Sequence, residues 1–439
     1  MKNLFHTLLF LCAAQVLSAQ NWIPMAQGIL PVDYVIFSIS AVEDHTVWAV
    51  ASQPIFQAPV PSTHKPLILR SADGGQTWTA LEVEEAIGTI SFRIVAVDSL
   101  MAYLTTQDYG SGSGRALYKT TDGGVNWNKE FSQNSAGVAL TRFPDGEHWL
   151  AHNRQYISHS ANNGANWTDA TVSGYKTDEF QILYSGTNMA SAVGDTLWNG
   201  TSSGRMLRFT QYGQASQFFD TGLGTSTTIS SVAFQDHLNG LCYSRNLANN
   251  NRIARSTDGG ATWSLLAKQP GNTTGWNITA VPGTPGFYVL ATNFNSTLGK
   301  IAITKDFGES WTIQNLNKPL NAITFTSPTT GWVGAGQILE DTQPALYKYN
   351  GAPLVGTTAP DALAGFWVSP NPTSALLRFG FDRYENGPVA ATLTNAAGQT
   401  IFTGTLSTPQ LDLTPFPAGL YLLTVQTEHG QAIGKVIRD

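Results

Sequence analysis

The stretch Arg255-Ser256-Thr257-Asp258-Gly259-Gly260-Ala261-Thr262-Trp263 indicates the fold of this chain more directly than any other. Short runs of strand-forming residues lie on both sides of its Asp-Gly pair. An aspartate side chain accepts hydrogen bonds from nearby backbone N–H groups, and glycine adopts positive φ angles, so the pair closes a tight turn between antiparallel strands. The stretch therefore predicts a β-hairpin whose second strand begins at a tryptophan.

The same turn recurs along the chain at a regular interval. Four further copies are present, two close and two weaker: Arg70–Trp78, Lys119–Trp127, Ser160–Trp167 and Thr304–Trp311. The spacing from Asn162 to Asp258 is about twice the others, which indicates a degenerate copy near Gln211, and another lies at Asn350. Seven units of roughly 40–50 residues are typical of propeller blades, each with four strands.

The two ends of the repeat region are expected to meet. The last unit lacks the tryptophan after its turn, while Asn21-Trp22-Ile23-Pro24 is similar to Thr77-Trp78-Thr79-Ala80. We therefore expect Trp22 and Ile23 to form the outer strand of the last blade, because such closure removes an exposed sheet edge. No amphipathic helical pattern competes with strands in this region.

These units resemble Asp-box repeats, also called BNR repeats, with the pattern Ser/Thr-x-Asp-x-Gly-x-Thr-Trp. The family includes sialidases, sortilin-like receptors, xyloglucanases and photosystem II assembly factors. The resemblance covers about residues 20–355 and implies that the boxes lie on outer hairpins, away from the ligand face. It gives a structural role to the turn residues and their tryptophans: Asp73, Trp78, Asp122, Trp127, Asn162, Trp167, Asp258, Trp263, Asp306 and Trp311.

Length, charge and the N-terminus narrow the class of protein. The 439 residues suffice for one large domain and one smaller domain. A formal charge of −6 gives no general attraction to nucleic acid. Residues 1–19 have the basic start, apolar run and small cleavage-site residues of a secretory signal peptide. No later apolar run is long enough to span a bilayer, so we expect an exported protein without a transmembrane segment.

The C-terminal part has a different pattern. Residues 356–365 are expected to form a linker, and residues 366–439 contain short strands that predict a small β-sandwich. The motifs Val368–Thr373, Leu393–Gly398, Pro417–Tyr421 and Lys435–Ile437 resemble the type IX secretion C-terminal sorting domain. The resemblance implies export by Bacteroidetes-type machinery that recognises residues 366–439, followed by release or attachment at the cell surface.

Candidate site residues lie on the loops opposite the Asp-boxes and on the inner strands. Three aromatic residues in those loops, Tyr109, Trp198 and Phe294, are candidate platforms for a sugar or peptide. A sialidase-like enzyme would need an arginine cluster, a tyrosine and acidic groups, for which the candidates are Arg93, Arg142, Glu179 and Tyr184. No motif for a metal or cofactor is present, so none is expected.

The sequence thus predicts an all-β chain: a seven-bladed β-propeller followed by a small C-terminal β-sandwich. The leading hypothesis is a secreted or cell-surface binding protein without catalytic activity, which recognises a glycan or a protein through its propeller loops. One alternative is a glycoside hydrolase of the sialidase-like or xyloglucanase-like type, which two facing carboxylates would favour. The other alternative is a scaffold or assembly factor for surface proteins.

Overall fold

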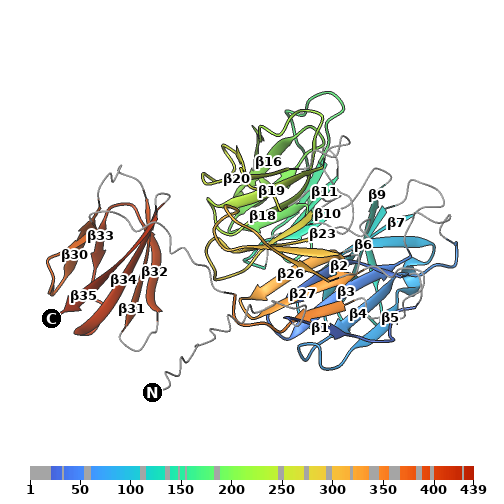
Figure 1. Cartoon of the computed structure of the whole chain (residues 1–439), viewed down its shortest axis with the longest axis horizontal. Helices are drawn as coiled ribbons and strands as arrows, with labels where there is room; N and C mark the ends of the chain where they lie inside the picture. Colours follow the sequence, from blue (N-terminus) through green and yellow to red (C-terminus); the bar gives the residue numbers. More distant parts are fainter. Residues whose placement is uncertain are drawn as a thin grey trace, which may run out of the picture.

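The fold is described from a computed structural model and is all-β, with two short 3-10 turns, η2 (Glu84–Ala86) and η3 (Gln211–Gly213), in the part described. Figure 1 shows the propeller and, beside it, a smaller body formed by the C-terminal strands. The expected signal peptide and linker lie outside the described residues. Those residues are 21–31, 34–53, 61–108, 115–133, 139–146, 149–153, 156–181, 188–245, 252–270, 276–292, 299–316, 320–335, 346–354, 366–381, 388–395, 400–427 and 430–439.

Between Trp22 and Tyr349 the described chain forms seven four-stranded antiparallel sheets, numbered here in chain order. The strands of sheets 1 to 3 are β2 (Val35–Val42), β3 (Thr46–Ser52), β4 (Leu67–Ser71), β5 (Thr79–Glu82); β6 (Thr89–Ala96), β7 (Ala102–Asp108), β8 (Arg115–Thr120), β9 (Asn128–Gln133); β10 (Ala139–Arg142), β11 (Trp149–Asn153), β12 (Tyr156–Ser160) and β13 (Thr168–Thr171).

The strands of sheets 4 to 7 are β14 (Ala190–Val193), β15 (Thr196–Gly200), β16 (Arg205–Thr210), β17 (Ala215–Asp220); β18 (Thr228–Phe234), β19 (Gly240–Arg245), β20 (Arg252–Ser256), β21 (Ser264–Leu265); β22 (Trp276–Ala280), β23 (Tyr288–Thr292), β24 (Lys300–Thr304), β25 (Thr312–Asn315); β26 (Leu320–Ser327), β27 (Thr330–Ala335), β28 (Leu346–Tyr349) and β1 (Trp22–Met25).

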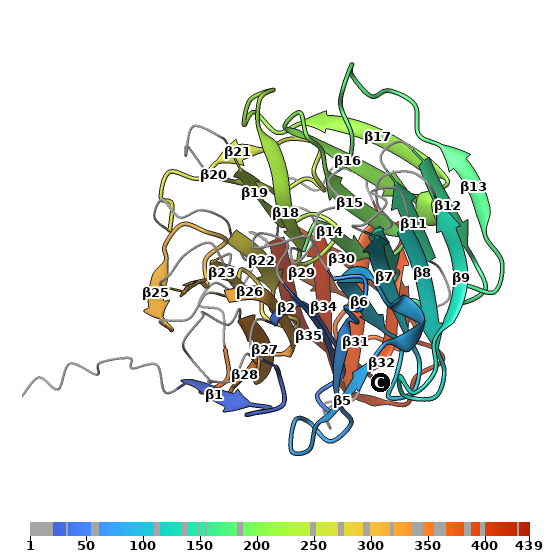
Figure 2. The same ribbon diagram turned by 90° about the vertical axis from the view of Figure 1, so that its right-hand side faces the viewer.

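Each sheet places its first strand toward the middle of the ring and its fourth strand outside. Figure 2 shows β2, β6, β14, β18, β22 and β26 around the middle, with β9, β13, β17, β21 and β25 toward the rim. The Asp-boxes join the third and fourth strands, so they share one end of the ring, called here the box face. The connections between second and third strands, and those between sheets, lie at the other end, the loop face.

The N-terminal strand completes sheet 7, as the sequence predicted. β1 pairs antiparallel with β28, with Trp22 opposite Tyr349 and Ile23 opposite Lys348. The Trp22 ring is buried and meets Tyr349 edge-to-face, with 5.4 Å between the ring centroids. The outer strand of the last sheet therefore comes from the beginning of the propeller.

Each Asp-box is held by hydrogen bonds in which polar atoms of the turn bond to one another. In sheet 1 the Ser71 hydroxyl donates to Asp73 Oδ1 (2.8 Å) and accepts from the Gly75 N–H (2.8 Å). The Thr77 hydroxyl and N–H both donate to Asp73, and these bonds lower the pKa of its carboxyl to about 2. Two of these bonds recur in the other four boxes. A hydroxyl two residues earlier and a backbone N–H four residues later both donate to the side chain of Asp122, Asn162, Asp258 or Asp306.

The boxes also join neighbouring sheets. Trp332 of sheet 7 packs against Gly75 of sheet 1, where a Cβ atom would lie 2.6 Å from the Trp332 ring. Lys348 lies over that ring and donates from Nζ to the Gly74 carbonyl (2.7 Å). Aromatic rings occupy the equivalent place behind three more boxes: Trp48 behind Gly124, Tyr103 behind Gly164 and Trp198 behind Gly260. The second glycine of the box is thus required for two reasons: its φ angle is positive, and the neighbouring ring leaves no room for a Cβ atom.

Residues 366–439 form two sheets that enclose a separate apolar core. One sheet has the order β32-β31-β34-β35 and the other β29-β30-β33. Their strands are β29 (Trp367–Ser369), β30 (Leu376–Gly380), β31 (Val389–Asn395), β32 (Thr400–Leu406), β33 (Gln410–Asp412), β34 (Gly419–Thr427) and β35 (Gly430–Arg438). Alternate residues of β31 and β34, among them Leu393, Leu423 and Val425, fill the core.

Two motifs of this domain are explained by hydrogen bonds. Asn371 lies between two prolines, which have no N–H to offer, and its side chain supplies both bonds to the edge of β35. Asn371 Nδ2 donates to the Lys435 carbonyl (2.7 Å), and Asn371 Oδ1 accepts from the Ile437 N–H (2.8 Å). The Tyr421 hydroxyl donates to the Pro417 carbonyl (2.6 Å) and fixes the turn that leads into β34.

We predict that Gly75→Ala destabilises the ring more than Gly283→Ala does. Both glycines have positive φ, which costs an alanine about 1 kcal/mol, but no atom lies within 4 Å of a Cβ at Gly283. At Gly75 the clash with Trp332 adds about 1–3 kcal/mol, as overpacking does in other cores. Denaturant unfolding of both variants measures the difference, and equal losses would contradict the account of the box.

Candidate functional site

The middle of the ring is lined by polar side chains that join successive sheets. The first strand of each sheet has a partner on one side only, so the N–H and C=O groups of its other edge face the centre. Side chains of one sheet bond to that edge on the next at six junctions: Ser38 to Ile94, Arg93 to Leu140, Ser191 to Phe234, Ser231 to Ile278, Asn277 to Asn321, and Asn321 to Ile36.

Asn188, which precedes β14, bridges three other sheets across the middle. Its side-chain Nδ2 donates to the carbonyls of Ile278 (2.7 Å) and Ile323 (3.2 Å), in sheets 6 and 7. Its own carbonyl accepts from the Val232 N–H in sheet 5 (2.7 Å). These bonds hold the start of sheet 4 to sheets 5, 6 and 7 in the middle of the ring.

Arg93 is the charged group of this lining that lacks a charged partner. Its Nε donates to the Leu140 carbonyl (2.8 Å), and no acidic side chain among the described residues pairs with it. Protein surrounds the guanidinium while part of the side chain remains accessible to solvent. Burial lowers the pKa of Arg93 to about 10, so the group stays protonated at neutral pH. Its Nε is fixed by the Leu140 carbonyl of sheet 3.

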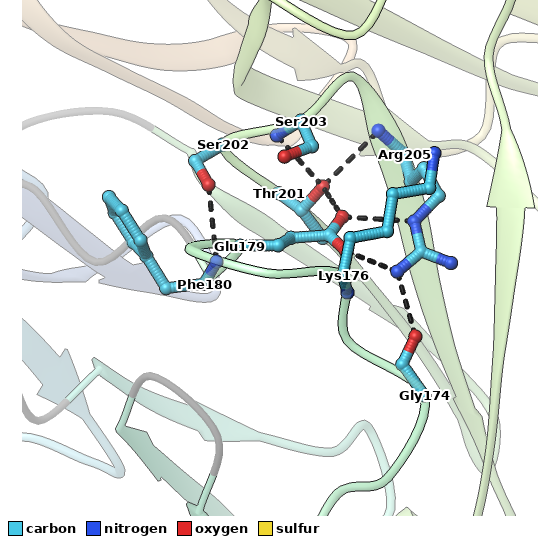
Figure 3. Close-up of polar contacts among 8 residues, drawn as sticks. All are labelled: Gly174, Lys176, Glu179, Phe180, Thr201, Ser202, Ser203 and Arg205. Carbon is cyan, nitrogen blue, oxygen red and sulfur yellow. Dashed lines mark hydrogen bonds and ion pairs between the residues drawn. The ribbon is translucent and has the colours of Figure 1, made fainter.

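Glu179 has the opposite situation, because all its acceptor capacity is used (Figure 3). It lies on the connection from sheet 3 to sheet 4 and is buried. Arg205 binds both carboxylate oxygens, from Nε to Oε1 (3.0 Å) and from Nη2 to Oε2. The Thr201 hydroxyl donates to Oε1 (2.7 Å) and the Lys176 N–H to Oε2 (2.9 Å). The pair fixes the connection onto the start of β16.

This environment makes Glu179 unsuitable as a proton donor. Burial alone would raise the pKa of its carboxyl, but the bonds from Arg205, Lys176 and Thr201 outweigh burial and lower it. A glycosidase acid needs a raised pKa and a free proton at neutral pH. Glu179 therefore holds a loop in place, and this role argues against its use as a catalytic acid.

Among the described residues, no contact joins Arg93 to Arg142 or Glu179. Arg142 lies at the end of β10, where its Nε donates to the Gly146 carbonyl (3.2 Å) at the box face. Tyr184 lies outside the described residues, as do the aromatic candidates Tyr109 and Phe294. No sialidase-like arginine cluster is thus formed by the described residues.

Trp198 requires a correction. The sequence placed it on a loop as an exposed platform, but it belongs to β15 and is 1% exposed. Its ring stacks on Phe234 with 3.8 Å between centroids, and its Nε1 donates to the Gly259 carbonyl (2.8 Å). Trp198 therefore joins sheet 4 to the box of sheet 5 and is not a ligand platform.

Two residues that position the site were not predicted from the sequence. Asn188 and Arg205 bond to partners far along the chain, so no local pattern identifies them. Within the described part of the chain, no cluster of side chains suits a metal ion, and no helix has the length and apolarity to span a membrane.

Comparisons with known proteins agree with this architecture. Residues 62–150 match the family model of the photosynthesis system II assembly factor YCF48, and residues 368–439 match the secretion system C-terminal sorting domain. No curated protein sequence matches the chain. The chain thus combines a YCF48-like repeat region with a C-terminal sorting domain.

Solved structures are similar in fold at low sequence identity. A structure of YCF48 bound to D1 peptide is 15% identical with a TM-score of 0.51, covering 76% of this chain and 97% of that one. YCF48 from Cyanidioschyzon merolae is 15% identical with a TM-score of 0.50, covering 75% and 98%. The Niastella koreensis GH74 enzyme is 13% identical with a TM-score of 0.46, covering 92% and 66%.

The fold and the sorting domain define the class: a secreted surface protein built on a β-propeller. The sorting domain supports export by the type IX system, which confirms that part of the sequence prediction. The all-β propeller fold is confirmed as well, since the sheets and the YCF48 structures agree.

We predict that Glu179→Gln lowers the free energy of unfolding by about 3 kcal/mol, because it leaves Arg205 without its buried charge partner. Glu309→Gln breaks the exposed pair with Arg255 and is expected to cost less than about 1 kcal/mol. Denaturant titration of both variants measures the contrast.

The same variant has an expected pH signature. Because folding lowers the pKa of Glu179, its contribution is complete above the usual value of 4.5 and is lost as the pH falls below it. Wild-type stability should therefore decline more steeply than that of Glu179→Gln between about pH 5 and 3. Parallel curves would show that the carboxylate is not held as described.

Proposed function

We propose that the protein is an exported, non-catalytic surface protein that binds an acidic segment of another protein inside the mouth of its propeller. Residues 20–355 would form the binding domain, and residues 366–439 would direct it to the surface. The single observation that carries the proposal is the enclosed Arg93 guanidinium, which has no acidic partner among the described residues.

The energetics of Arg93 favour an anionic ligand. A cation that is surrounded by protein without a counter-charge is costly, and an incoming carboxylate would offset that cost. A guanidinium binds a carboxylate through two parallel N–H···O bonds, and partial enclosure strengthens these bonds relative to water. With Nε held by the Leu140 carbonyl, the Nη groups are pre-oriented for such a ligand.

Two observations support a protein ligand over a glycan substrate. The family model that matches residues 62–150 describes an assembly factor, and a protein of similar fold is solved with a D1 peptide. Glu179, the candidate acid for glycoside hydrolysis, is ionised and forms an ion pair with Arg205. A protein with this ligand would act both as a binding protein and as a scaffold or assembly factor for surface proteins.

We predict that the propeller binds peptides with acidic side chains or a free C-terminal carboxylate, and that Arg93→Met lowers their affinity at least about ten-fold, or roughly 1.4 kcal/mol. The measurement uses an array of acidic peptides, matched with their amide counterparts, beside a glycan array. Arg252→Met is the control, because Arg252 is an exposed cation at the loop face, on the third strand of sheet 5 and not on an inner strand. It should change affinity only through general electrostatics, within about two-fold.

Two results would overturn the proposal. Peptide affinities equal for wild type and Arg93→Met would remove Arg93 from the site. Hydrolysis of an arrayed glycan by the wild type would restore the enzyme alternative.

A further inference from the structure

The sorting domain carries exposed apolar side chains on one face of its larger sheet. Leu420 and Leu422 lie two residues apart on β34 and are 41% and 46% exposed. Ile437 on β35, 38% exposed, lies opposite Leu420 in the register. These three residues and Lys435, which lies opposite Leu422, are called the outer patch. Its position follows from strand alternation, since Tyr421, Leu423 and Val436 point into the core.

The motifs that mark this domain as a sorting signal are mostly unavailable to a partner. Asn371 is bonded to β35, the Tyr421 hydroxyl to Pro417, and Val436 is buried in the core. Such residues stabilise the fold of the domain. A protein partner can contact only the side chains that are exposed on its surface. Among the side chains described on β34 and β35, the exposed large apolar groups are Leu420, Leu422 and Ile437 of the outer patch.

We infer that the outer patch is the surface by which the sorting domain docks on a protein of the secretion machinery. The partner would present an apolar surface with an acidic group beside it, because Lys435 is exposed and belongs to no ion pair among the described residues. The apolar side chains supply the contact area, and a charge at the rim favours the correct partner over others.

Occupation by the machinery is favoured by the identity of the domain. Residues 368–439 match a family described by its role in sorting, and the patch lies on the last two strands of that match. The inference rests on this sorting role and not on the ligand proposed for the propeller, so the two stand or fall separately. A second copy of the chain is the other occupant that the experiment distinguishes.

The experiment measures export of the full-length chain from a host with a type IX secretion system, as the fraction of protein that reaches the surface or medium. We predict that Leu422→Asn combined with Ile437→Asn lowers this fraction at least about ten-fold, and that Lys435→Glu lowers it as well. Leu376→Asn is the matched control, because Leu376 is 39% exposed on the other sheet. It should export like the wild type.

Melting curves of purified full-length variants, made in a host without the secretion system, separate docking from folding. We expect the patch variants and Lys435→Glu to melt within a few degrees of wild type although their export falls. If the double variant is unstable, Lys435→Glu alone decides, since an exposed charge can be reversed without loss of packing. Wild-type export of Lys435→Glu and of the folded patch variants would overturn the inference. So would equal loss in Leu376→Asn, or a loss confined to dimerisation with export intact.

Discussion

Pairing of β1 with β28 joins the beginning of the propeller to its end, and the rest of the ring depends on that pairing. A row of sheets without it would leave the outer edge of sheet 7 unpaired and prone to association. With it, Trp22 enters the core between Phe325 and Tyr349. In the closed ring, Asn188 bonds to sheets 6 and 7, and Arg93 of sheet 2 bonds to sheet 3. The site is thus a consequence of the ring.

The two ends of the ring serve different purposes. At the box face, the aspartate carboxylates accept hydrogen bonds from their own turns. The glycines of the boxes pack against aromatic rings of the neighbouring sheets. At the loop face, a buried ion pair fixes the connection from sheet 3 to sheet 4. Arg93 lies within the ring, where it bonds to the Leu140 carbonyl and pairs with no acidic side chain among the described residues. Contacts between sheets thus come both from the box face and from the side chains in the middle of the ring, where the proposed binding residue Arg93 also lies.

The sequence predicted what is local or repeated. The Asp-box turn could be read because its hydrogen bonds stay within a few residues, and the closing strand because Trp22 repeats the surroundings of Trp78. The Glu179–Arg205 pair could not be predicted, since it joins residues 26 positions apart with no periodic signal. Trp198 was misplaced because its polar neighbours suggested a loop, whereas an aromatic ring behind the next box is a tertiary requirement. The motifs of the sorting domain were predictive as markers, although their hydrogen bonds became clear only from the fold.

The N-terminal strand closes the ring as the outer strand of sheet 7, and its Trp22 side chain lies in the core. The most direct test is the unfolding free energy of Trp22→Ala beside Ile23→Ala in the same strand. Trp22 is buried, so its truncation is expected to cost about 3–5 kcal/mol. Ile23 is largely outside the core, and its truncation is expected to cost less than about 1 kcal/mol. Equal and small losses for the two variants would contradict closure by β1.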